Sequence, residues 1–255
     1  MRLRLVLLTA AVAAVAAFPT IPLAAKVLYN PDLFQGDIKG VAGQEAGRER
    51  AAKLGTEFLW PWGEVPYVLG RSITTDQSSV IQAGMKDFHA KTCLRFVPRT
   101  TESNYIEIVS DDISTSCWSN VGMIRGKQLV SLYSDGCIYT GTAIHELMHT
   151  VGFFHEHNRN DRDDYVTIHS ENVDPDVGMS NFDKDENWQY VGEDYNYASI
   201  MHYDMYAFSK EWGLKTIVPK DPNVVLVGPF KKDSMEESDA RQINTLYAAE
   251  CARRQ

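Results

Sequence analysis

Residues 145–155 read HELMHTVGFFH, and this stretch decides the fold. His145 and His149 lie four residues apart on a helix that we predict over residues 140–151, so both rings project from one face about one turn apart. Two imidazoles in this arrangement can reach the same metal ion at about 2.1 Å. Glu146 follows the first histidine, where its carboxylate can lie beside the metal without binding it and accept a proton from water.

A sharp end to this helix supplies the third candidate ligand. Gly152 allows the chain to turn away, because glycine tolerates positive φ, and the turn brings His155 towards the first two histidines. Three imidazoles and one open position make a catalytic zinc site. A lone HExxH occurs by chance on many surface helices, whereas HExxHxxGxxH is far more restrictive and has the metzincin spacing. We therefore predict one zinc ion per subunit.

A second short stretch reads SIMHY over residues 199–203. A methionine that follows a loop, well downstream of the third histidine, fits the turn that underlies the metal in metzincins. Met201 on its own would more often be core packing. Tyr203 follows two residues later and could point back to the metal.

The first 17 residues predict a secretory signal peptide. Arg2 and Arg4 precede an apolar run over residues 5–17, which is the order of charge and apolarity that such peptides have. The run is shorter than the roughly 20 apolar residues that a membrane span needs, and prolines follow it at positions 19 and 22. We expect a secreted, extracellular protein with no membrane anchor.

The cysteine count agrees with export, and the charge argues against one class of partner. An even number of cysteines in a secreted chain predicts two disulfides, with three possible pairings. The four cysteines are Cys93, Cys117, Cys137 and Cys251. The formal net charge of −9 is dispersed along the chain, which argues against a nucleic-acid binder, because such a protein would carry a basic stripe.

Residues 18–50 differ in composition from the residues that follow. They contain three prolines and a glycine-rich stretch over residues 36–47, and they end in Arg48-Glu49-Arg50. A basic cluster at such a boundary suits a trypsin-like or furin-like processing protease, and a charged surface loop is the alternative. We predict a propeptide over residues 18–50 and one catalytic domain over residues 51–255.

The order of the expected elements favours an α+β fold. Apolar spacing predicts helices over residues 74–93, 140–151 and 236–250, the first with Thr74 and Gln77 at capping-box spacing. Short apolar runs predict strands over residues 65–69, 94–97 and 105–109, and a hairpin formed by residues 118–124 and 128–133. Beyond Gly152 the chain is polar and rich in loops, with short apolar segments at 216–218 and 224–227.

Residues 145–166, HELMHTVGFFHEHNRNDRDDYV, closely resemble the astacin metallopeptidases, as does SIMHY at 199–203. Residues 51–60 resemble the start of a mature astacin, with Ala51-Ala52, Leu54-Gly55 and Leu59-Trp60. TIVP at 216–219 and DARQIN at 239–244 resemble later segments of the family. The resemblance covers the chain nearly end to end from residue 51 to residue 251.

The resemblance implies a zinc metalloendopeptidase with a two-lobed, zincin-like α+β domain. A mixed five-stranded sheet and the active-site helix would form the first lobe, and substrate would lie along an edge strand near residues 128–133. The zinc ligands would be His145, His149 and His155, with Glu146 as general base and then general acid. Tyr203 would bind zinc at rest and later hydrogen-bond the oxyanion, and Met201 would be the Met-turn residue.

The resemblance also implies a latent precursor. FQGD at residues 34–37 is similar to the FxGD motif of astacin prosegments, in which the aspartate occupies the water's place on zinc, so Asp37 would be an inhibitory ligand. A trypsin-like protease would cut after Arg50, and the new amino group of Ala51 would pair with Glu156. The implied disulfides are Cys93–Cys251 and Cys117–Cys137.

One departure from the family is His157, which stands where astacins usually have glutamine. It is two residues from His155 and lacks the ligand spacing, so we expect a non-ligand. His89, His169 and His202 are expected to be structural or surface residues. No further domain follows Cys251 in this sequence, which is typical of a minimal, monomeric member that acts on proteins or peptides.

Two other classes of function remain open at this point. One is a zinc-binding module without catalysis, against which Glu146 and Tyr203 argue. The other is a precursor that never matures. The sequence does not determine the biological role or the side-chain preference around the cleaved bond.

Overall fold

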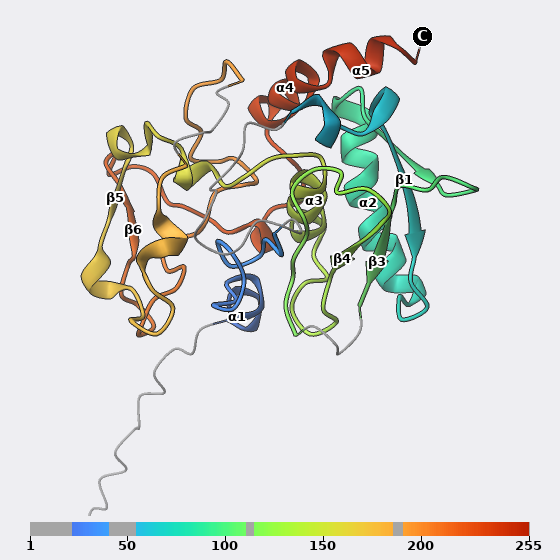
Figure 1. Cartoon of the computed structure of the whole chain (residues 1–255). Coiled ribbons are helices and arrows are strands. Elements are labelled where there is room, and N and C mark those ends of the chain that lie inside the picture. The colour runs from blue at the N-terminus through green and yellow to red at the C-terminus, as the bar shows by residue number, and fades with distance from the viewer. Residues whose placement is uncertain (1–21, 41–54, 111–114, 186–190, 255) are drawn as a thin grey trace, which may run out of the picture.

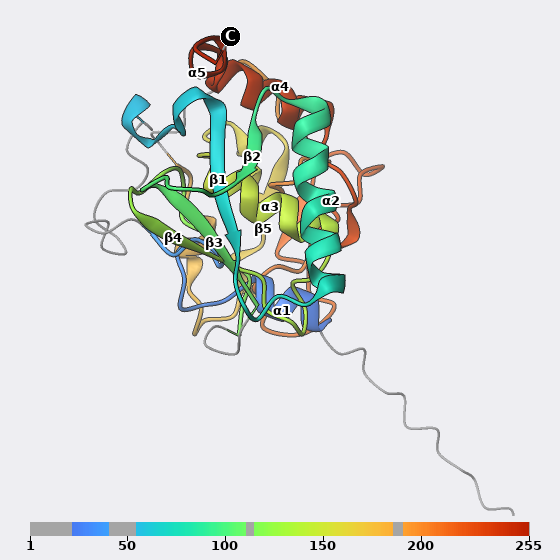
Figure 2. The same cartoon turned by 90° about the vertical axis from the view of Figure 1, so that its right-hand side faces the viewer.

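The computed structural model describes residues 22–40, 55–110, 115–185 and 191–254. One lobe is built on a four-stranded sheet in the order β2-β1-β3-β4, and all three neighbouring pairs are parallel. The strands are β1 (Glu64–Leu69), β2 (Arg95–Pro98), β3 (Tyr105–Val109) and β4 (Lys127–Ser131). Figure 2 shows this sheet with α2 and α3 on one side of it.

Two helices pack against each other beside the sheet. α2 (Thr75–Lys91) begins with the expected capping box, because the Thr74 and Gln77 side chains each bond the other's backbone N–H. Its apolar face buries Ile81 and Phe88. α3 (Thr140–Thr150) packs on α2 and is buried along its whole length after the first residue, so its histidines lie inside the protein.

The second lobe follows Gly152 and has little regular structure. Its sheet is one antiparallel pair, β5 (Val166–Ile168) and β6 (Ile217–Pro219). The chain then returns to the first lobe through α4 (Glu237–Leu246) and α5 (Ala248–Ala252). Figure 1 shows β5 and β6 on one side of α3 and the larger sheet on the other. The α+β class expected from the sequence is therefore confirmed.

The remaining helical segments are short. α1 (Leu23–Leu28) lies in the predicted propeptide, where the sequence analysis expected no element. The 3-10 turns are Thr56–Phe58, Pro61–Gly63, Glu156–Asn158, Arg162–Asp164, Ser170–Asn172, Met179–Phe182 and Pro229–Lys231.

The expected fifth, antiparallel strand is reduced among the described residues to one bridge between Trp118 and Ser131. Gly122, Arg125 and Gly126 all have positive φ, and this conformation interrupts an extended strand. The Gln128 side chain replaces the missing ladder, because it accepts from Ile124 N at 3.0 Å and donates to Gly122 O at 3.0 Å.

Residues 22–40 pair with this bridged segment. Ile38 forms a parallel bridge with Ser119, Lys39 N donates to Ser119 O at 2.9 Å, and Ser119 N donates to Asp37 O at 3.0 Å. The backbone that pairs with this peptide is therefore residues 117–119. The expectation that substrate would lie along residues 128–133 stays a prediction. Figure 1 shows α1 and the following loop below α3, between the lobes.

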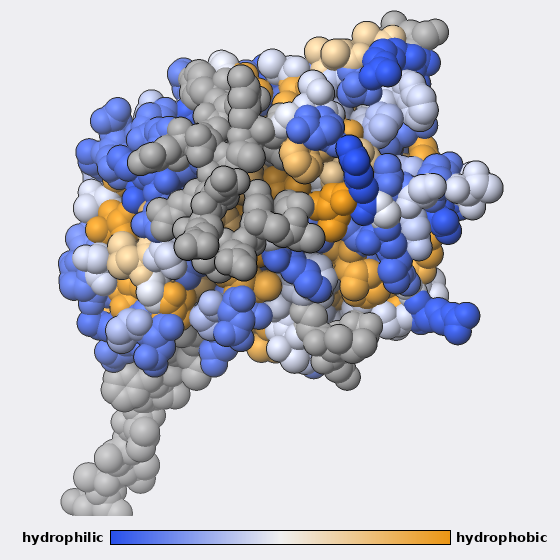
Figure 3. Space-filling view, in the orientation of Figure 1, coloured by the Kyte–Doolittle hydropathy of each residue, from blue (hydrophilic) through white to orange (hydrophobic). Residues whose placement is uncertain are grey.

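The outer surface is mixed in character. On the face in Figure 3, hydrophilic residues predominate over the β5–β6 lobe, and hydrophobic residues reach the surface in separate patches. Within the described residues, no helix combines the length and apolar character required to span a bilayer.

Candidate active site

Two of the candidate zinc ligands project from α3 and are fully buried. The His145 Nδ1 lies 2.8 Å from Ile200 O, and the His149 Nδ1 lies 2.7 Å from Phe153 O. A carbonyl oxygen can only accept, so each Nδ1 carries the proton and each Nε2 keeps its lone pair. These backbone contacts therefore fix both rings in the tautomer that a metal ligand at Nε2 requires.

The third histidine reaches the same point from the other lobe. Gly152 has φ of 109°, a conformation that glycine adopts without strain, and the chain turns there out of α3. The His155 ring centre lies 4.7 Å from that of His149 and 5.2 Å from that of His145. The sequence-predicted set His145, His149 and His155 is thus brought together.

The carboxylate of Asp37 lies in the middle of the three imidazoles. Its Oδ2 is 2.9 Å from His145 Nε2, and its Oδ1 is 3.1 Å from His155 Nε2 and 3.3 Å from His149 Nε2. All four donor atoms lie within 4.8 Å of one another. Burial raises the pKa of Asp37, but the neighbouring His155 and His149 outweigh that effect and hold it well below its usual range.

These residues fit a zinc ion. His149 Nε2 and Asp37 Oδ1 are buried and have no hydrogen-bond partner among the described residues, although they face other donor atoms of the cluster. Burial lowers the pKa of His145, and it lowers the pKa of His155 to about 3, and both shifts favour the neutral imidazole that binds a metal. Three imidazoles and a carboxylate oxygen are ligands that Zn²⁺ accepts.

Glu146 lies one residue after the first histidine and is fully buried. Both carboxylate oxygens lack a hydrogen-bond partner within the part of the chain that the structure describes. Burial raises the pKa of Glu146 well above its usual value, and the charge of Asp37 raises it further. A buried carboxyl with a raised pKa is the group expected of an acid–base catalyst.

Tyr203 covers the side of the cluster that faces His155. Its ring centre lies 4.5 Å from that of His155, and its hydroxyl donates to the backbone carbonyl of Gln35. Gln35 also places its side-chain Oε1 3.0 Å from His155 Nδ1. The peptide at residues 35–37 therefore touches the histidines and the tyrosine together.

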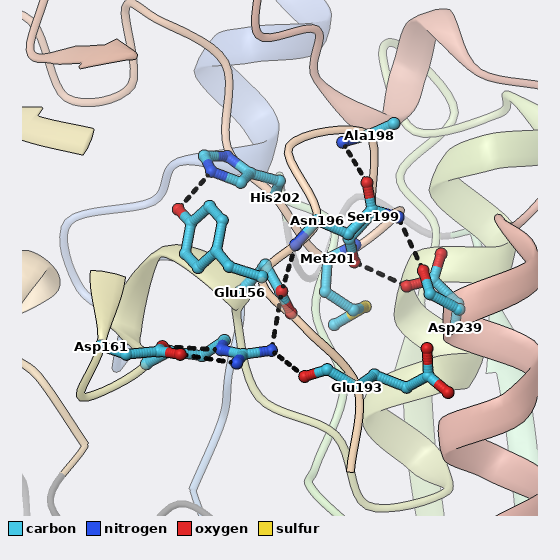
Figure 4. A network of polar contacts seen from close by, with 12 residues as sticks. Glu156, Asp161, Glu193, Asn196, Ala198, Ser199, Met201, His202 and Asp239 are labelled. Atoms are coloured by element: carbon cyan, nitrogen blue, oxygen red, sulfur yellow. Dashed lines mark hydrogen bonds and ion pairs between the residues drawn. The ribbon is translucent and has the colours of Figure 1, made fainter. Parts of the chain in front are cut away.

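A polar network behind the site holds the turn that contains Met201 (Figure 4). The buried carboxylate of Asp239 accepts from Ser199 Oγ at 2.6 Å and from Ile200 N at 2.9 Å. The Met201 carbonyl accepts from Glu156 N at 3.0 Å, which joins this turn to the loop of His155. The sequence analysis missed Asp239 as a support, and its only signal was the resemblance of residues 239–244 to a family segment.

Glu156 is buried beside this turn. It accepts from Arg159 Nη1 at 3.1 Å and from Asn196 N at 2.8 Å. Burial raises its pKa to about 7, against the lowering effect of Arg159. Its expected partner Ala51 lies outside the described residues, as do Arg50 and the predicted signal peptide, so these predictions remain untested.

The remaining histidines lie outside the metal cluster. The His157 ring is buried with its centre 3.9 Å from that of Tyr203, and His202 Nε2 lies 2.6 Å from Tyr195 Oη. His89 Nε2 accepts from Phe96 N at 2.9 Å, and His169 pairs with Glu171 at the surface.

Both disulfides have the pairing that the resemblance implies. Cys93 is bonded to Cys251, and Cys117 is bonded to Cys137. The first joins the end of α2 to α5, and the second closes the segment that pairs with residues 22–40.

Comparison with known proteins agrees with this geometry. The model of the peptidase family Astacin matches residues 53–248. Among solved structures, high choriolytic enzyme 1, a hatching enzyme zinc-protease from Oryzias latipes, is similar with a TM-score of 0.71 and 35% identity. That match covers 78% of this chain and 99% of the other.

Curated relatives match over most of this chain. The zinc metalloproteinase nas-8 of Steinernema carpocapsae is 39% identical over 87% of this chain and 53% of its own length. The embryonic protein UVS.2 of Xenopus laevis is 42% identical over 78% of this chain and 38% of its own. The chain thus spans about half the length of these relatives or less. With its three histidines and glutamate in the required arrangement, the chain belongs to the astacin family of zinc metalloproteinases.

Proposed function

We propose that this protein is a secreted zinc endopeptidase, made as a latent precursor, that hydrolyses peptide bonds in proteins. The observation that carries the proposal is the convergence of three imidazole Nε2 atoms on one point beside the buried carboxyl of Glu146. Family membership supports the same activity.

The residues divide the chemistry among them. His145, His149 and His155 would hold zinc, which supplies a Lewis acid for the scissile carbonyl and lowers the pKa of water. Glu146 accepts the proton of the attacking water and then delivers a proton to the leaving amine. Tyr203 releases the Gln35 carbonyl and donates its hydroxyl to the oxyanion; such a donor typically contributes about 10²–10³ in rate.

Latency would come from the peptide at residues 35–37. The Asp37 carboxylate occupies the point on which the histidines converge, and the Gln35 carbonyl engages the Tyr203 hydroxyl. Catalysis needs both the point on which the histidines converge and the Tyr203 hydroxyl. This peptide must therefore leave before substrate can bind. Residues 18–50 are accordingly a propeptide with Asp37 as its inhibitory ligand.

Activation would require cleavage after Arg50 by a trypsin-like protease. The catalytic domain would then be residues 51–255, with the amino group of Ala51 paired to Glu156. The buried Glu156 supports this step, since burial raises its pKa to about 7 and a nearby ammonium would favour its charged form. Residues 1–17 would direct secretion as a signal peptide, and the mature enzyme would act as a monomer on proteins or peptides.

The test compares Glu146→Ala with the wild type, both as the processed enzyme. Glu146→Ala should still bind one zinc ion but lose about 10²–10⁴ in casein hydrolysis, and chelation should abolish wild-type activity. Metal analysis beside the activity assay separates catalysis from simple zinc binding. Casein hydrolysis by Glu146→Ala at the wild-type rate would exclude the mechanism.

Latency has its own test in the uncleaved chain. Asp37→Ala should raise the activity of the precursor, because the carboxylate no longer occupies the centre of the cluster. Asp32→Ala, an exposed aspartate of the same segment, is the matched control and should leave the precursor latent. Equal latency of both variants would contradict the role of Asp37.

A further inference from the structure

A second propeptide residue is inserted beside the catalytic tyrosine. Tyr29 follows α1 and is only 8% exposed. Its ring centre lies 4.8 Å from that of Tyr203 and 5.5 Å from that of Phe208. We name the position enclosed by Tyr203, Asp204 and Phe208 the Tyr29 site.

The polar end of Tyr29 is bound as specifically as its ring. Its hydroxyl accepts from Asp204 N at 3.3 Å, and the Asp204 carboxylate is its other polar neighbour. The carboxylate is held in place because its Oδ1 accepts from Tyr206 N at 2.7 Å. The Tyr29 site therefore offers a phenol a backbone N–H that donates to it and a carboxylate that can accept from it.

The backbone of the Tyr29 site is held in an unfavourable conformation. Phe208 has φ of 54°, which a bulky residue adopts only where its surroundings enforce it. Its carbonyl accepts from Asp174 N at 2.9 Å, and its ring also packs on Phe182. Such strain concentrates at ligand-binding positions.

The Tyr29 site is next to the reacting centre. A Cβ on Gly36 would lie 2.7 Å from Phe208 Cζ and 3.1 Å from the Tyr203 hydroxyl, and the Tyr29 Cα is 3.3 Å from the same point. The Tyr29 site thus adjoins the residue before Asp37 and shares Tyr203 with the candidate catalytic groups.

All three residues of the Tyr29 site belong to the chain just after Met201, so they remain when the propeptide leaves. We propose that the Tyr29 site is a substrate subsite that selects a tyrosine side chain flanking the cleaved bond, with Asp204 as the specificity-determining residue. The inference rests on the proposed peptidase function. The bound tyrosine is the occupant that the structure presents, and a lysine or arginine attracted by Asp204 is the competing outcome.

The experiment uses the processed, zinc-containing enzyme and sets of peptides that differ at one position. Cleavage of a diverse peptide mixture first locates the cut, and matched peptides then carry Tyr, Phe or Lys at each position flanking it. We expect kcat/KM for Tyr to exceed that for Phe by about tenfold at one flanking position, as a hydrogen bond to a charged group allows.

The variants test Asp204 through the ratio of kcat/KM for the Tyr peptide to kcat/KM for the Phe peptide. Asp204→Ala should bring the Tyr-to-Phe ratio close to one. Asp204→Asn retains an acceptor for Tyr206 N and should give an intermediate ratio, and the exposed Asp76→Asn on α2 should retain the wild-type ratio. A ratio measured in one preparation does not depend on the folded fraction, so partial misfolding cannot imitate the effect.

The outcomes separate the subsite from the function on which it rests. Chelator-sensitive cleavage with equal rates for Tyr and Phe, a preference for Lys, or a Tyr preference that survives Asp204→Ala would each overturn the subsite alone. Absence of chelator-sensitive cleavage of every peptide would overturn the proposed function and the subsite together.

Discussion

The sheet lobe and the lobe after Gly152 each bury their half of the metal centre by different means. In the sheet lobe, parallel strand ladders, a capped helix and two disulfides hold the chain. In the second lobe, buried polar side chains such as Arg159 and Asn158 do so. His145 and His149 depend on the first kind of support and His155 on the second.

The difference shows which contacts each half of the centre depends on. A helix satisfies its own backbone groups, so α3 needs only apolar packing to place the backbone of His145 and His149, while Ile200 O and Phe153 O orient their rings. An irregular loop leaves its N–H and C=O groups to be paired by side chains or other segments. The second lobe should therefore be sensitive to single polar substitutions, and the first to loss of its covalent links and packing.

The largest effect is expected from the Cys93–Cys251 disulfide, whose residues are 158 apart in the chain. In the chain-entropy model, a closed loop of this size contributes about 5 kcal/mol. The double variant Cys93→Ser, Cys251→Ser should lose that amount of unfolding free energy in urea titrations. Cys117→Ser, Cys137→Ser opens a loop of 20 residues and should lose about 3 kcal/mol. A larger loss from the shorter loop would contradict the comparison.

The second effect concerns the polar support of the Met201 turn. Asp239→Ala removes a fully buried carboxylate that accepts from Ser199 Oγ, Ile200 N and Glu236 N. Leaving such donors unpaired should cost about 4 kcal/mol, measured by urea unfolding. The exposed Asp76→Ala should change stability by less than about 1 kcal/mol. Equal losses from the two variants would mean that the network does not hold the turn.

The sequence predicted the sheet lobe well because its signals are local. The capping box at Thr74 and the apolar spacing of Ile81, Met85 and Phe88 predict α2, and HExxH on a helix predicts two ligands. The fifth strand was predicted wrongly as a long segment, because the side chain of Gln128 replaces a backbone ladder.

The second lobe could not be predicted in the same way. Asp239 lies 39 residues from Ile200, and no periodicity links a buried carboxylate to the backbone that it pairs. α1 and the Tyr29 site were also missed, since each depends on contacts between residues far apart in the sequence. The third candidate ligand could be predicted only because Gly152 and His155 follow the helix at a fixed spacing.

The third effect concerns the junction of the lobes at the end of α3. The Trp60 Nε1 donates to Thr150 O at 2.9 Å, and the side chain is fully buried. Trp60→Phe removes that donor and leaves a small cavity, which should cost about 2 kcal/mol in urea titrations. Trp62→Phe, at a position 52% exposed, should cost less than about 0.5 kcal/mol. An equal loss of unfolding free energy for both variants would show that the Trp60 hydrogen bond at this junction does not stabilise the protein.

The smallest effect is a pH dependence at Lys232, whose Nζ donates to Ala198 O at 3.0 Å and to Ser199 O at 2.6 Å. Burial lowers its pKa to about 8, against Asp239 and Glu236. The unfolded chain has a lysine pKa of about 10.4, so it binds the proton more tightly than the folded protein does. The folded protein is therefore most stable, as far as Lys232 is concerned, above about pH 10.4. This stability is lost as the pH falls through about 8.

Lys232→Met removes this titration and provides the measurement. Because Lys232 is only partly buried, solvent screening reduces the effect to about 1 kcal/mol. The unfolding free energy of the wild type, relative to Lys232→Met, should rise by that amount between about pH 8 and about pH 10.4. A constant difference in unfolding free energy between the two proteins across this range would contradict the prediction. It would mean that the carbonyls of Ala198 and Ser199 stabilise the charged lysine as well as water does, so that burying the ammonium costs no electrostatic free energy.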